Sequence, residues 1–320
     1  MQTIHPKAID FSIVIVNWNT GNLLKACLQS IFEQSPPGTF EIIVVDNASA
    51  DDSCELMQSH FPQVKLISNQ VNLGFARANN QGIRYGQGQY IMLLNPDTCF
   101  LKDVLSEIKG VLDQQPDIGI IGAQLVTPDN TLQRWARGNM LSLWTAFNHY
   151  LFLSDLFPRR RFFAGIADNV NHQMITDMDW VSGACLTIRR GIFEQVGLLD
   201  ETLFMYNEDM ELCYRVKQAG YRVVYLPTAR VKHFVSQSMQ QQSEEKILAG
   251  PLRSQDDFYQ RLYGQKRLIL FRSIICVGTF LRFVFRLVLL LLRSGEQSRY
   301  RLREAKRYAL TAVNLWRSTI

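Results

Sequence analysis

The stretch Tyr90–Cys99, YIMLLNPDTC, is the part of the sequence that best indicates the fold. Four apolar residues, Ile91–Leu94, run directly into Asn95, Pro96 and Asp97, which is typical of a buried strand that ends on a carboxylate. Proline cannot extend the hydrogen-bonding ladder of a sheet, so the strand must stop here. Ligands in open α/β sheets bind beyond the carboxyl ends of the strands, which makes Asp97 a candidate metal or substrate ligand. A solvated acid in a turn is the alternative.

Further apolar runs precede this stretch and alternate with helical segments. Strands are predicted at Phe11–Val16, Glu41–Val45 and Val64–Ser68, and helices at Leu23–Phe32 and Gly74–Tyr85. This alternation predicts an α/β fold with a mostly parallel central sheet flanked by helices. In such a sheet Asp46, which follows the second strand, lies at the same edge as Asp97, where a nucleotide could bind. The turns lack the glycine patterns of P-loop and ordinary dinucleotide sites.

The second half of the chain adds two predicted strands. Trp180–Ile188, WVSGACLTI, reads as one strand in which Gly183 and Ala184 leave room for a ligand. Tyr221–Leu226 is another, and His233 follows shortly after it. The middle segment, residues 129–177, is irregular, with many aromatic residues and three consecutive arginines at 159–161. It could be a lid or an acceptor-binding insertion, although core packing and a solvated loop explain most of these residues.

Glu208 and Asp209 open a predicted helix that continues to Ala219 and ends at Gly220. Two adjacent residues cannot share one helical face, so their carboxylates should have different roles. A transferase that inverts its reacting carbon needs a general base to take the proton of the acceptor hydroxyl. We assign the base to Asp209, with Glu208 binding the acceptor or tuning the site. Stabilisation of the helix dipole by both acids is the alternative.

A transferase that uses a sugar nucleotide must also stabilise a diphosphate leaving group, which a divalent cation does directly. Mg²⁺ or Mn²⁺ commonly takes one or two protein carboxylates and fills its other positions with phosphates and water. Asp97 is the candidate ligand, and His233 could supply an imidazole. A histidine that serves no metal is an equal alternative.

Charge is unevenly distributed along the chain. From Pro251 onward, fourteen Lys and Arg residues accompany four Asp and Glu residues, a net charge of +10, which leaves −5 for the preceding residues out of the total of +5. This asymmetry indicates an anionic partner for the tail, either nucleic acid or a membrane. The six cysteines are scattered and the N-terminal residues contain no apolar signal-peptide region, which predicts reduced thiols and a cytoplasmic catalytic part.

The segment Leu268–Leu292 is strongly apolar but contains Arg272, Arg282 and Arg286. Because a membrane span wants roughly 20 uninterrupted apolar residues, an amphipathic helix in the membrane interface, with its arginines at the headgroups, fits better. A helix that packs on the domain or on a partner subunit is the alternative. Nucleic-acid binding is not expected, because aliphatic residues stand between the arginines where stacking aromatics would be needed.

Taken in order, these motifs resemble family 2 of the glycosyltransferases, which has the Rossmann-like GT-A fold, and within it the bacterial rhamnosyltransferase-like group. Ser12–Thr20, SIVIVNWNT, is similar to the opening strand and nucleotide loop of the family. Val44–Ser53, VVDNASADDS, is similar to the segment whose aspartate contacts the nucleobase. Asn72–Gly82, NLGFARANNQG, resembles the N-x-G-F-A-x-A-x-N-x-G helix of the family.

The remaining motifs continue the resemblance as far as Ser238. Leu94–Thr98, LNPDT, is similar to the D-x-D metal motif, with Asn95 at the position of the first acid. Val181–Ala184 and Asp200–Arg215 resemble the acceptor-side glycine strand and the acid pair that carries the base. His233–Ser238, HFVSQS, resembles H-x-x-G-x-S, with Ser236 in place of the glycine.

The resemblance implies roles for particular residues. Donor binding is expected from Asn17, Asn19, Asp46, Asn72, Gly74, Phe75, Asn79, Asn95 and Asp97. Acceptor binding is expected from Trp180, Gly183, Ala184 and Glu208, catalysis from Asp209 with Glu208, and binding of Mg²⁺ or Mn²⁺ from Asp97 and His233.

The expected organisation is a GT-A domain over residues 1–240, with a donor half to about 125 and an acceptor half from about 126, followed by a basic, apolar helical tail over 241–320. The expected enzyme is an inverting, metal-dependent transferase that moves rhamnose from dTDP-L-rhamnose to a polyprenyl-diphosphate-linked glycan, in O-antigen or another cell-surface polysaccharide. It would lie on the inner face of the membrane through its tail, and it could form a homo-oligomer. The alternatives are a UDP-sugar donor (galactofuranose, GlcNAc or glucose) or a non-catalytic nucleotide-binding module.

Overall fold

The computed structural model describes residues 9–35, 40–168, 170–203, 205–234 and 244–292. The motif positions Ser236 and Ser238 and the tail residues 293–320 lie outside the described residues. The chain divides into two units, which we describe separately. A sheet unit comprises residues 1–138 and 171–241, and a helical unit comprises residues 139–170 and 242–320.

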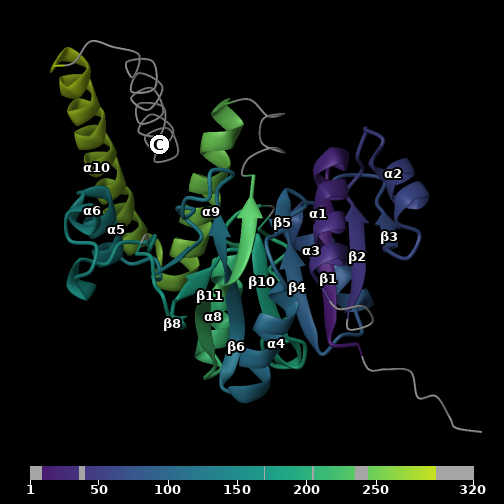
Figure 1. Ribbon diagram of the computed structural model, residues 1–320. Helices are drawn as coiled ribbons and strands as arrows, with labels where there is room; N and C mark the ends of the chain where they lie inside the picture. The colour runs from purple at the N-terminus through teal and green to yellow at the C-terminus, as the bar shows by residue number, and fades with distance from the viewer. Residues whose placement is uncertain (1–8, 36–39, 169, 204, 235–243, 293–320) are drawn as a thin grey trace, which may run out of the picture. The chain divides into compact units, whose positions relative to one another are not determined.

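The sheet unit is built on a nine-stranded sheet with the order β3-β2-β1-β4-β10-β6-β11-β5, in which β8 also pairs with β11 (Figure 1). A separate two-stranded sheet pairs β7 with β9. The strands are β1 Phe11–Asn17, β2 Phe40–Asp46, β3 Lys65–Ser68, β4 Tyr90–Leu94, β5 Thr98–Phe100, β6 Ile118–Val126, β7 Arg137–Gly138, β8 Thr176–Asp177, β9 Trp180–Val181, β10 Cys185–Arg189 and β11 Arg222–His233.

The strands that carry the expected site are parallel. β1 pairs in parallel with β2 on one side and with β4 on the other, and Asn17 lies opposite Asp46 in the first of these pairs. β11 is parallel to β6, whereas β10 is antiparallel to both β4 and β6. The carboxyl ends of β1, β2 and β4 therefore meet at one edge, which confirms the expected common edge for Asp46 and Asp97.

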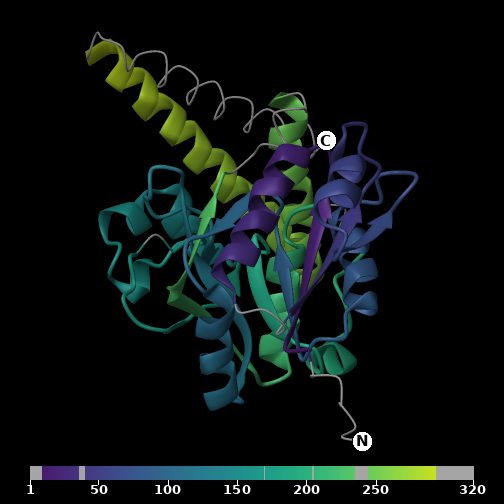
Figure 2. The ribbon, with the colours of Figure 1, turned by 45° about the vertical axis from the view of Figure 1, so that its right-hand side comes forward.

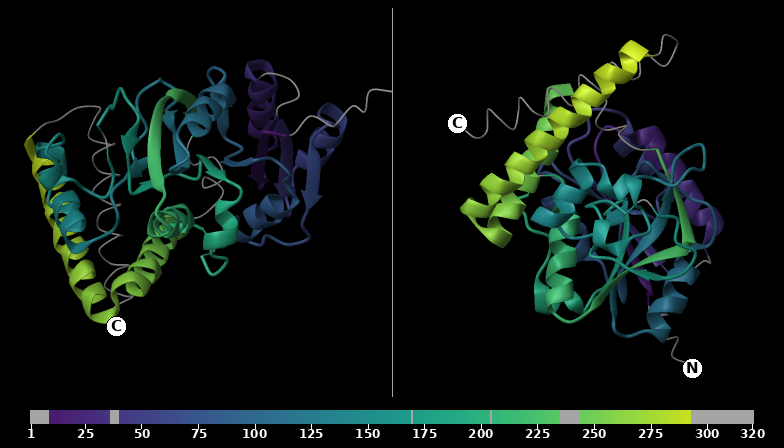
Figure 3. Two further views of the ribbon diagram at one scale, coloured as in Figure 1. Left: turned by 90° about the horizontal axis from the view of Figure 1, so that it is seen from below. Right: turned by 90° about the vertical axis from the view of Figure 1, so that its left-hand side faces the viewer.

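Helices cover both faces of this sheet, as the left panel of Figure 3 shows for α1 and α3. Alternate residues of a strand point to opposite faces. Accordingly Ile13 and Ile15 pack in the main core with α1 and α4, whereas Val16 packs with Ala78 of α3. The helices are α1 Gly21–Gln34, α2 Ser53–His60, α3 Phe75–Tyr85, α4 Val104–Gln114, α7 Ile192–Val196 and α8 Glu208–Gln218. All six cysteines are free thiols.

Two predicted strands differ from the structure. Trp180–Ile188 is not one strand: Trp180 and Val181 form β9, residues 182–184 turn, and β10 begins at Cys185 in the main sheet. The last strand is longer than Tyr221–Leu226, because an irregularity between Leu226 and Arg230 lets β11 continue to His233 and pair with β5. His233 is thus fixed by a strand and does not follow one.

The helical unit combines two segments that are far apart in the sequence. The first contains α5 Leu143–Tyr150, α6 Leu153–Leu156 and a single 3₁₀ turn, η1 Arg161–Phe163. The second contains α9 Glu244–Tyr263 and the uninterrupted helix α10 Gln265–Leu292 (Figure 2). The expected organisation assigned residues 139–170 to the acceptor half, whereas the structure groups them with the C-terminal helices.

Helix α10 approaches α5 closely at Gly278, where an added Cβ would lie 2.5 Å from Cβ of Tyr150. Two of its arginines are bound within the unit. Arg272 pairs with Asp256 of α9 at 3.0 Å, and Arg282 donates from Nε to the carbonyl of Tyr150 at 3.1 Å and from Nη2 to that of His149. The expectation that these two arginines point to lipid headgroups was wrong, because both guanidinium groups are held by partners within the helical unit.

The stretch Gln265–Phe285 of α10 is long and apolar enough, by length and composition alone, to cross a membrane. The sequence-based view that its arginines make it too short is corrected by this result. A helix of this kind is also found in the cores of soluble proteins, although only 28% of this stretch is buried in the protein.

Candidate active site

Hydrogen bonds to the buried carboxylate of Asp46 join the loops after β1 and β2. Its Oδ1 accepts hydrogen bonds from Asn17 Nδ2 at 2.9 Å and Ser49 Oγ at 2.6 Å, and its Oδ2 accepts one from the Ser49 backbone N–H at 3.0 Å. Asn19 adds a further hydrogen bond between the same two loops, since its Oδ1 accepts from the backbone N–H of Ala50 at 2.6 Å. Asn17 and Asp46 therefore hold the loops in place.

The next predicted donor residues are organised by Asn47, which the sequence analysis did not single out. Asn47 Nδ2 donates to Asn72 Oδ1 at 2.9 Å, and Asn47 Oδ1 accepts from the backbone N–H of Leu73 at 3.0 Å. Asn72 Oδ1 also accepts from the N–H of Gly74 at 2.9 Å, just before α3 begins at Phe75. Asn72 and Gly74 thus lie in one hydrogen-bonded turn beside the end of β2.

Two consecutive asparagines of α3 have different roles. Asn79 was expected to bind the donor, but its side chain is buried and donates to the carbonyl of Phe75 in its own helix at 3.0 Å. Asn80 was not predicted. Its Oδ1 accepts from the N–H of Leu199 at 3.0 Å, and its Nδ2 donates to the carbonyl of Leu199 at 2.9 Å. Asn80 therefore ties α3 to the segment that leads into α8.

The turn after β4 places Asp97 in a fixed, buried position. The backbone N–H of Asn95 donates to the carbonyl of Ala184 at 3.1 Å, and the carbonyl of Asp97 accepts from the N–H of Phe234 at 2.8 Å. Asp97 is 5% exposed. The side-chain Oδ1 of Asn95 is buried and forms no hydrogen bond with the part of the protein that the structure describes.

Asp97 faces His233 across the ends of β4 and β11. The distance from His233 Nε2 to Asp97 Oδ1 is 3.1 Å, and His233 Nδ1 lies 2.8 Å from Gln133 Oε1. Since Gln133 Oε1 can only accept, Nδ1 carries the proton. Nε2 faces Asp97 Oδ1 and lies 3.5 Å from Asn95 Nδ2, so it can carry a second proton and pair with Asp97, accept from the Asn95 amide, or direct its lone pair at a cation. Gln133 was missed by the sequence analysis.

This pair fits a divalent ion. Two adjacent ligands that each lie about 2.1 Å from an octahedral ion are about 3 Å apart, which matches the separation between His233 Nε2 and Asp97 Oδ1. A hydrogen bond from the second ring nitrogen to a neighbouring group, here Gln133, is typical of metal-binding histidines. Over the described ranges, no group of three or more His, Cys, Asp or Glu side chains could share an ion, so the protein would supply two ligands.

The acid pair at the start of α8 lies against the segment between β9 and β10. Asp209 Oδ2 accepts from the backbone N–H of Gly183 at 2.8 Å, and Oδ1 accepts from that of Met210 at 2.8 Å. Burial raises the pKa of Asp209, and these two hydrogen bonds offset part of the increase because they favour the ionised form.

In the described part of the chain, the carboxyl group of Glu208 lacks the hydrogen-bond donors that Asp209 has. It is 6% exposed, and its Oε2 forms no hydrogen bond within the described ranges. Burial, together with the charge of neighbouring Asp209, raises the pKa of Glu208 to about 8. Two backbone N–H groups favour the ionised form of Asp209, whereas Glu208 Oε2 has no donor within the described ranges, so Asp209 is the better candidate for the carboxylate that accepts a proton.

Residues 182–184 connect the turn that contains Asp97 with the acid pair of α8. Gly183 binds Asp209 and Ala184 binds Asn95, and a Cβ on Gly183 would lie 3.7 Å from Cε1 of Phe75. Phe75 and Asp209 thus both lie against Gly183. Trp180 belongs to the separate β7–β9 sheet and is buried, with 4% of its surface exposed.

The parallel sheet, the acidic turn after β4 and the buried acid pair define a GT-A transferase domain. The chain belongs to glycosyl transferase family 2, since the sequence model of that family matches residues 12–197. It is 28% identical over 237 residues to N-acetylglucosaminyl-diphospho-decaprenol L-rhamnosyltransferase of Mycobacterium tuberculosis, covering 71% of this chain and 76% of the relative. It is 29% identical to rhamnosyltransferase WbbL of Escherichia coli, covering 69% and 82%.

Other similar proteins are longer than this chain. An uncharacterised protein of Sinorhizobium fredii is 31% identical over 71% of this chain, which spans only 24% of that protein. Among solved structures, mannosyltransferase PcManGT of Pyrobaculum calidifontis with GDP-Man and Mn²⁺ has a TM-score of 0.58 at 15% identity, covering 97% of this chain and 88% of that one. GalNAc-T7 with UDP, GalNAc and Mn²⁺ has a TM-score of 0.57 at 19% identity, covering 82% and 52%.

Proposed function

We propose that this protein is an inverting, metal-dependent rhamnosyltransferase. It transfers L-rhamnose from dTDP-L-rhamnose to a hydroxyl group of a polyprenyl-diphosphate-linked glycan during assembly of O-antigen or a related cell-surface polysaccharide. The two rhamnosyltransferase relatives, one of which is named for a decaprenol-linked acceptor, support both the sugar and the acceptor class. The proposed location is the cytoplasmic face of the membrane, with attachment through the C-terminal helices.

The observation that carries this proposal is that Asp209 and the turn containing Asp97 are bound by neighbouring residues. Gly183 binds Asp209, and Ala184 binds the turn. The Gly183 N–H holds Asp209 Oδ2, and the carbonyl of Ala184 holds the backbone of Asn95. A base on the acceptor side and a carboxylate on the diphosphate side are thereby fixed to one three-residue segment. An inverting transfer requires such a pair of groups, since the acceptor oxygen attacks opposite the leaving group.

In the proposed reaction Asp209 removes the proton of the acceptor hydroxyl as its oxygen bonds to the anomeric carbon of the sugar. The bond from that carbon to the diphosphate breaks, and dTDP leaves with the electron pair. Glu208 keeps its proton at neutral pH and can donate a hydrogen bond to the acceptor. Asp46, which Asn17 and Ser49 hold at the end of β2, would contact the nucleobase.

Asp97 and His233 would hold Mg²⁺ or Mn²⁺, and such an ion neutralises charge that develops on a diphosphate leaving group. The Mn²⁺ in the two structural neighbours is consistent with this assignment. Gln133 keeps His233 in the tautomer that leaves Nε2 open to an ion. Asn95 supplies a neutral amide oxygen where an acidic residue would add a charge.

Thermal unfolding of the purified protein tests the proposal, with dTDP-rhamnose, dTDP, UDP-sugars and GDP-mannose compared with and without Mn²⁺. A ligand at about a hundred times its Kd stabilises the native state by about 2.7 kcal/mol, which is readily measured. We expect stabilisation by dTDP ligands that requires metal, and its loss in Asp97→Asn. Asp117→Asn, which alters an acid with a 56% exposed side chain, is the control.

Stronger stabilisation by a UDP-sugar would show that the donor is a UDP-sugar and not dTDP-rhamnose, and it would not contradict the mechanism. Unchanged metal dependence in Asp97→Asn would refute the metal assignment. A folded protein that none of these nucleotides stabilises would favour a non-catalytic module.

A further inference from the structure

The helical unit carries most of the large apolar side chains that the described residues expose. Five of them lie along one face of α10 with the spacing of a single helical stripe, and between 39% and 56% of each is exposed. We call this set the α10 stripe: Leu270, Val277, Leu281, Val284 and Val288. Isolated exposed apolar residues are common in proteins, but a continuous row over most of a long helix marks a binding surface.

The opposite face of α10 carries buried residues and both bound arginines. Leu268, Phe271 and Ile275 are each at most 1% exposed. Arg272 lies on the same side with its partner Asp256, and Arg282 lies there against the end of α5 and over the ring of Phe152, 4.2 Å from its centroid.

This arrangement is the reverse of that of a helix on a water-exposed surface, where charged residues point outward. Between Leu268 and Phe285 both charged residues of α10 turn inward and are bound, whereas Lys266 and Arg267 at its start are exposed. Inward, paired charges beside outward apolar residues are characteristic of helices that face lipid.

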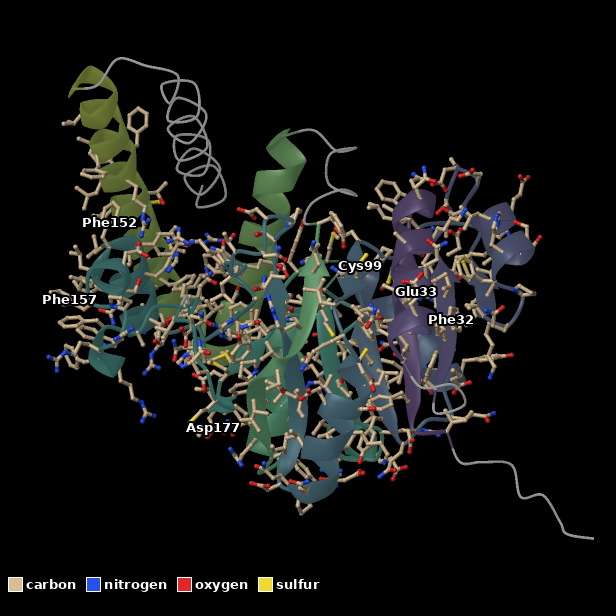
Figure 4. All side chains as sticks on the ribbon, viewed as in Figure 1. Phe32, Glu33, Cys99, Phe152, Phe157 and Asp177 are labelled. Carbon is tan, nitrogen blue, oxygen red and sulfur yellow. The ribbon has the colours of Figure 1, made fainter. Side chains whose placement is uncertain are left out.

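A second exposed feature of the helical unit is the loop over residues 156–162, LFPRRRF, which we call the basic-aromatic loop. Leu156 and Phe162 are 67% and 66% exposed, and the three arginines at 159–161 are exposed between them. Figure 4 shows Phe157 at the outer edge of this unit. Arginines flanked by exposed apolar and aromatic residues are typical of protein segments at the headgroup level of a bilayer.

The loop and the stripe belong to one packed unit. Just before the loop, Phe152 forms an edge-to-face contact with Phe285 of α10, with ring centroids 5.7 Å apart. Arg282 joins the same place by its hydrogen bonds to the end of α5. The basic-aromatic loop is therefore held near the C-terminal half of α10.

We propose that the basic-aromatic loop and the α10 stripe form one surface that binds an anionic lipid bilayer, with the stripe in the hydrocarbon and the three arginines on headgroup phosphates. This gives the proposed membrane attachment two named contacts and does not depend on the identity of the transferred sugar. We favour a bilayer over a second copy of the chain because the three exposed arginines of the loop carry positive charge. An anionic bilayer complements that charge.

Vesicle flotation of the full-length protein tests the electrostatic contact, with phosphatidylcholine vesicles that contain or lack phosphatidylglycerol. The variant Arg159→Gln/Arg160→Gln/Arg161→Gln should bind anionic vesicles roughly tenfold or more weakly, since each basic residue near such a surface contributes about 1 kcal/mol. The matched control, Lys25→Gln/Arg190→Gln/Arg230→Gln, removes the same charge from the sheet unit and should bind as the wild type does. Equal losses in both triple variants would overturn the assignment of the loop.

The apolar contact is tested with Leu270→Gln/Val277→Gln/Leu281→Gln. These side chains are exposed, so the fold should persist, and circular dichroism checks this directly. We expect loss of binding to both kinds of vesicle and no change in oligomeric state by light scattering. A variant that turns an oligomer into a monomer and still binds vesicles would show that a second copy covers the stripe, and the lipid proposal would be wrong.

Nucleotide-dependent stabilisation, measured on the same preparations, separates this proposal from the proposed function. Loss of vesicle binding with stabilisation by dTDP and Mn²⁺ intact supports the lipid surface. A wild-type protein that binds vesicles but no nucleotide would refute the transferase proposal and leave the lipid surface standing. A wild-type protein that binds nucleotide and floats with neither kind of vesicle would refute the lipid surface.

Discussion

Glu208 and Asp209 are adjacent in the sequence, but their carboxyl groups have different surroundings. Asp209 accepts two backbone N–H groups, whereas Glu208 Oε2 is buried and accepts no hydrogen bond from the described part of the chain. The first environment favours a carboxylate and the second a protonated acid. The sequence alone could show only that the two residues point in different directions.

The two acids should respond differently to isosteric amide substitution. Asp209→Asn should lower kcat about 10²–10⁴-fold, the usual contribution of a general base, and leave nucleotide stabilisation unchanged. Glu208→Gln should keep most of the activity, because an amide resembles the protonated acid. Initial rates of sugar transfer measure both effects. An active Asp209→Asn variant, together with an inactive Glu208→Gln variant, would move the base to Glu208.

The raised pKa of Glu208 should make stability depend on pH. Between about pH 4.5 and 8, the native state keeps a proton on Glu208 that the unfolded state has lost. The free energy of unfolding therefore falls as pH rises through this window, by at most about 1.4 kcal/mol per pH unit from this group. Urea unfolding from pH 5 to 9 should show a steeper fall in the wild type than in Glu208→Gln. Parallel curves would contradict the assignment.

Gln133 should matter for metal binding without touching the metal. Gln133→Leu removes the acceptor for His233 Nδ1, so the ring loses its fixed tautomer, and the affinity for Mn²⁺ should fall about 10–100-fold. Titration of Mn²⁺ by electron paramagnetic resonance measures this affinity directly, without the reaction. Gln195→Leu, which alters an exposed glutamine elsewhere in the sheet unit, is the control. Equal affinities for both variants would exclude this role.

The difference between Asp97 and Gln133 shows which residues a sequence can reveal. Asp97 was predicted because a local pattern, an apolar run stopped by proline, places it at a strand end. Gln133 lies 100 residues from His233 in an irregular segment, so no local pattern marks it. Asn17 and Asn79 were predicted as donor contacts. Both amides are buried and bond to the protein itself, as buried polar groups generally must, and their role in donor binding stays a prediction.

At the level of elements, the continuous apolar runs of β1, β2 and β4 were enough to predict a parallel sheet with its acids at one edge. The break between β9 and β10 was not predicted, because the apolar pattern of Trp180–Ile188 continues through residues 182–184. Only the pairing of β10 with β4 and β6, and of β9 with β7, shows that the chain changes sheet there.

Two glycines in helix interiors allow a test of how α3 packs on the sheet. A Cβ at Gly82 of α3 would lie 2.4 Å from Cγ1 of Val14 in β1, whereas nothing lies within 4 Å of one at Gly110 of α4. Gly110→Ala should stabilise the protein by up to about 1 kcal/mol. Gly82→Ala should destabilise it by about 1–3 kcal/mol, because the core is overpacked. Chemical denaturation measures both, and a stabilised Gly82→Ala would contradict the close packing of α3 on β1.

On the scale of the whole molecule, the two units interrupt one another along the chain. The sheet unit resumes at residue 171 after the first segment of the helical unit, and the helical unit resumes at residue 242. Sequence analysis drew one boundary near residue 240, since the apolar, basic tail was the only clear change in composition. The pairing of α5 with α10 depends on contacts such as that of Gly278 with Tyr150, which composition does not reveal.

A truncated protein that ends at residue 240 should therefore retain the sheet unit but lose the partners of residues 139–170. Ala146 and Asn148, which are fully buried in the intact chain, lie in this segment. We expect rapid proteolysis within 139–170 while stabilisation by dTDP and Mn²⁺ persists. A protein that ends at Leu292 keeps α9 and α10 and is the matched control. Equal resistance of this segment in both forms would contradict the division into these units.

The interleaving of the two units also sets an order of events during synthesis. All segments of the sheet unit leave the ribosome before residues 244–292, so this unit can complete its fold while α9 and α10 are still being made. Residues 139–170 must wait for those helices, on the order of ten seconds at usual rates of translation. During that interval the loop with its three arginines is already outside the ribosome and can reach the bilayer before α10 exists. Under the proposed lipid binding, a nascent chain would thus be directed to the membrane by a loop from its middle, and α10 would arrive later to hold it there.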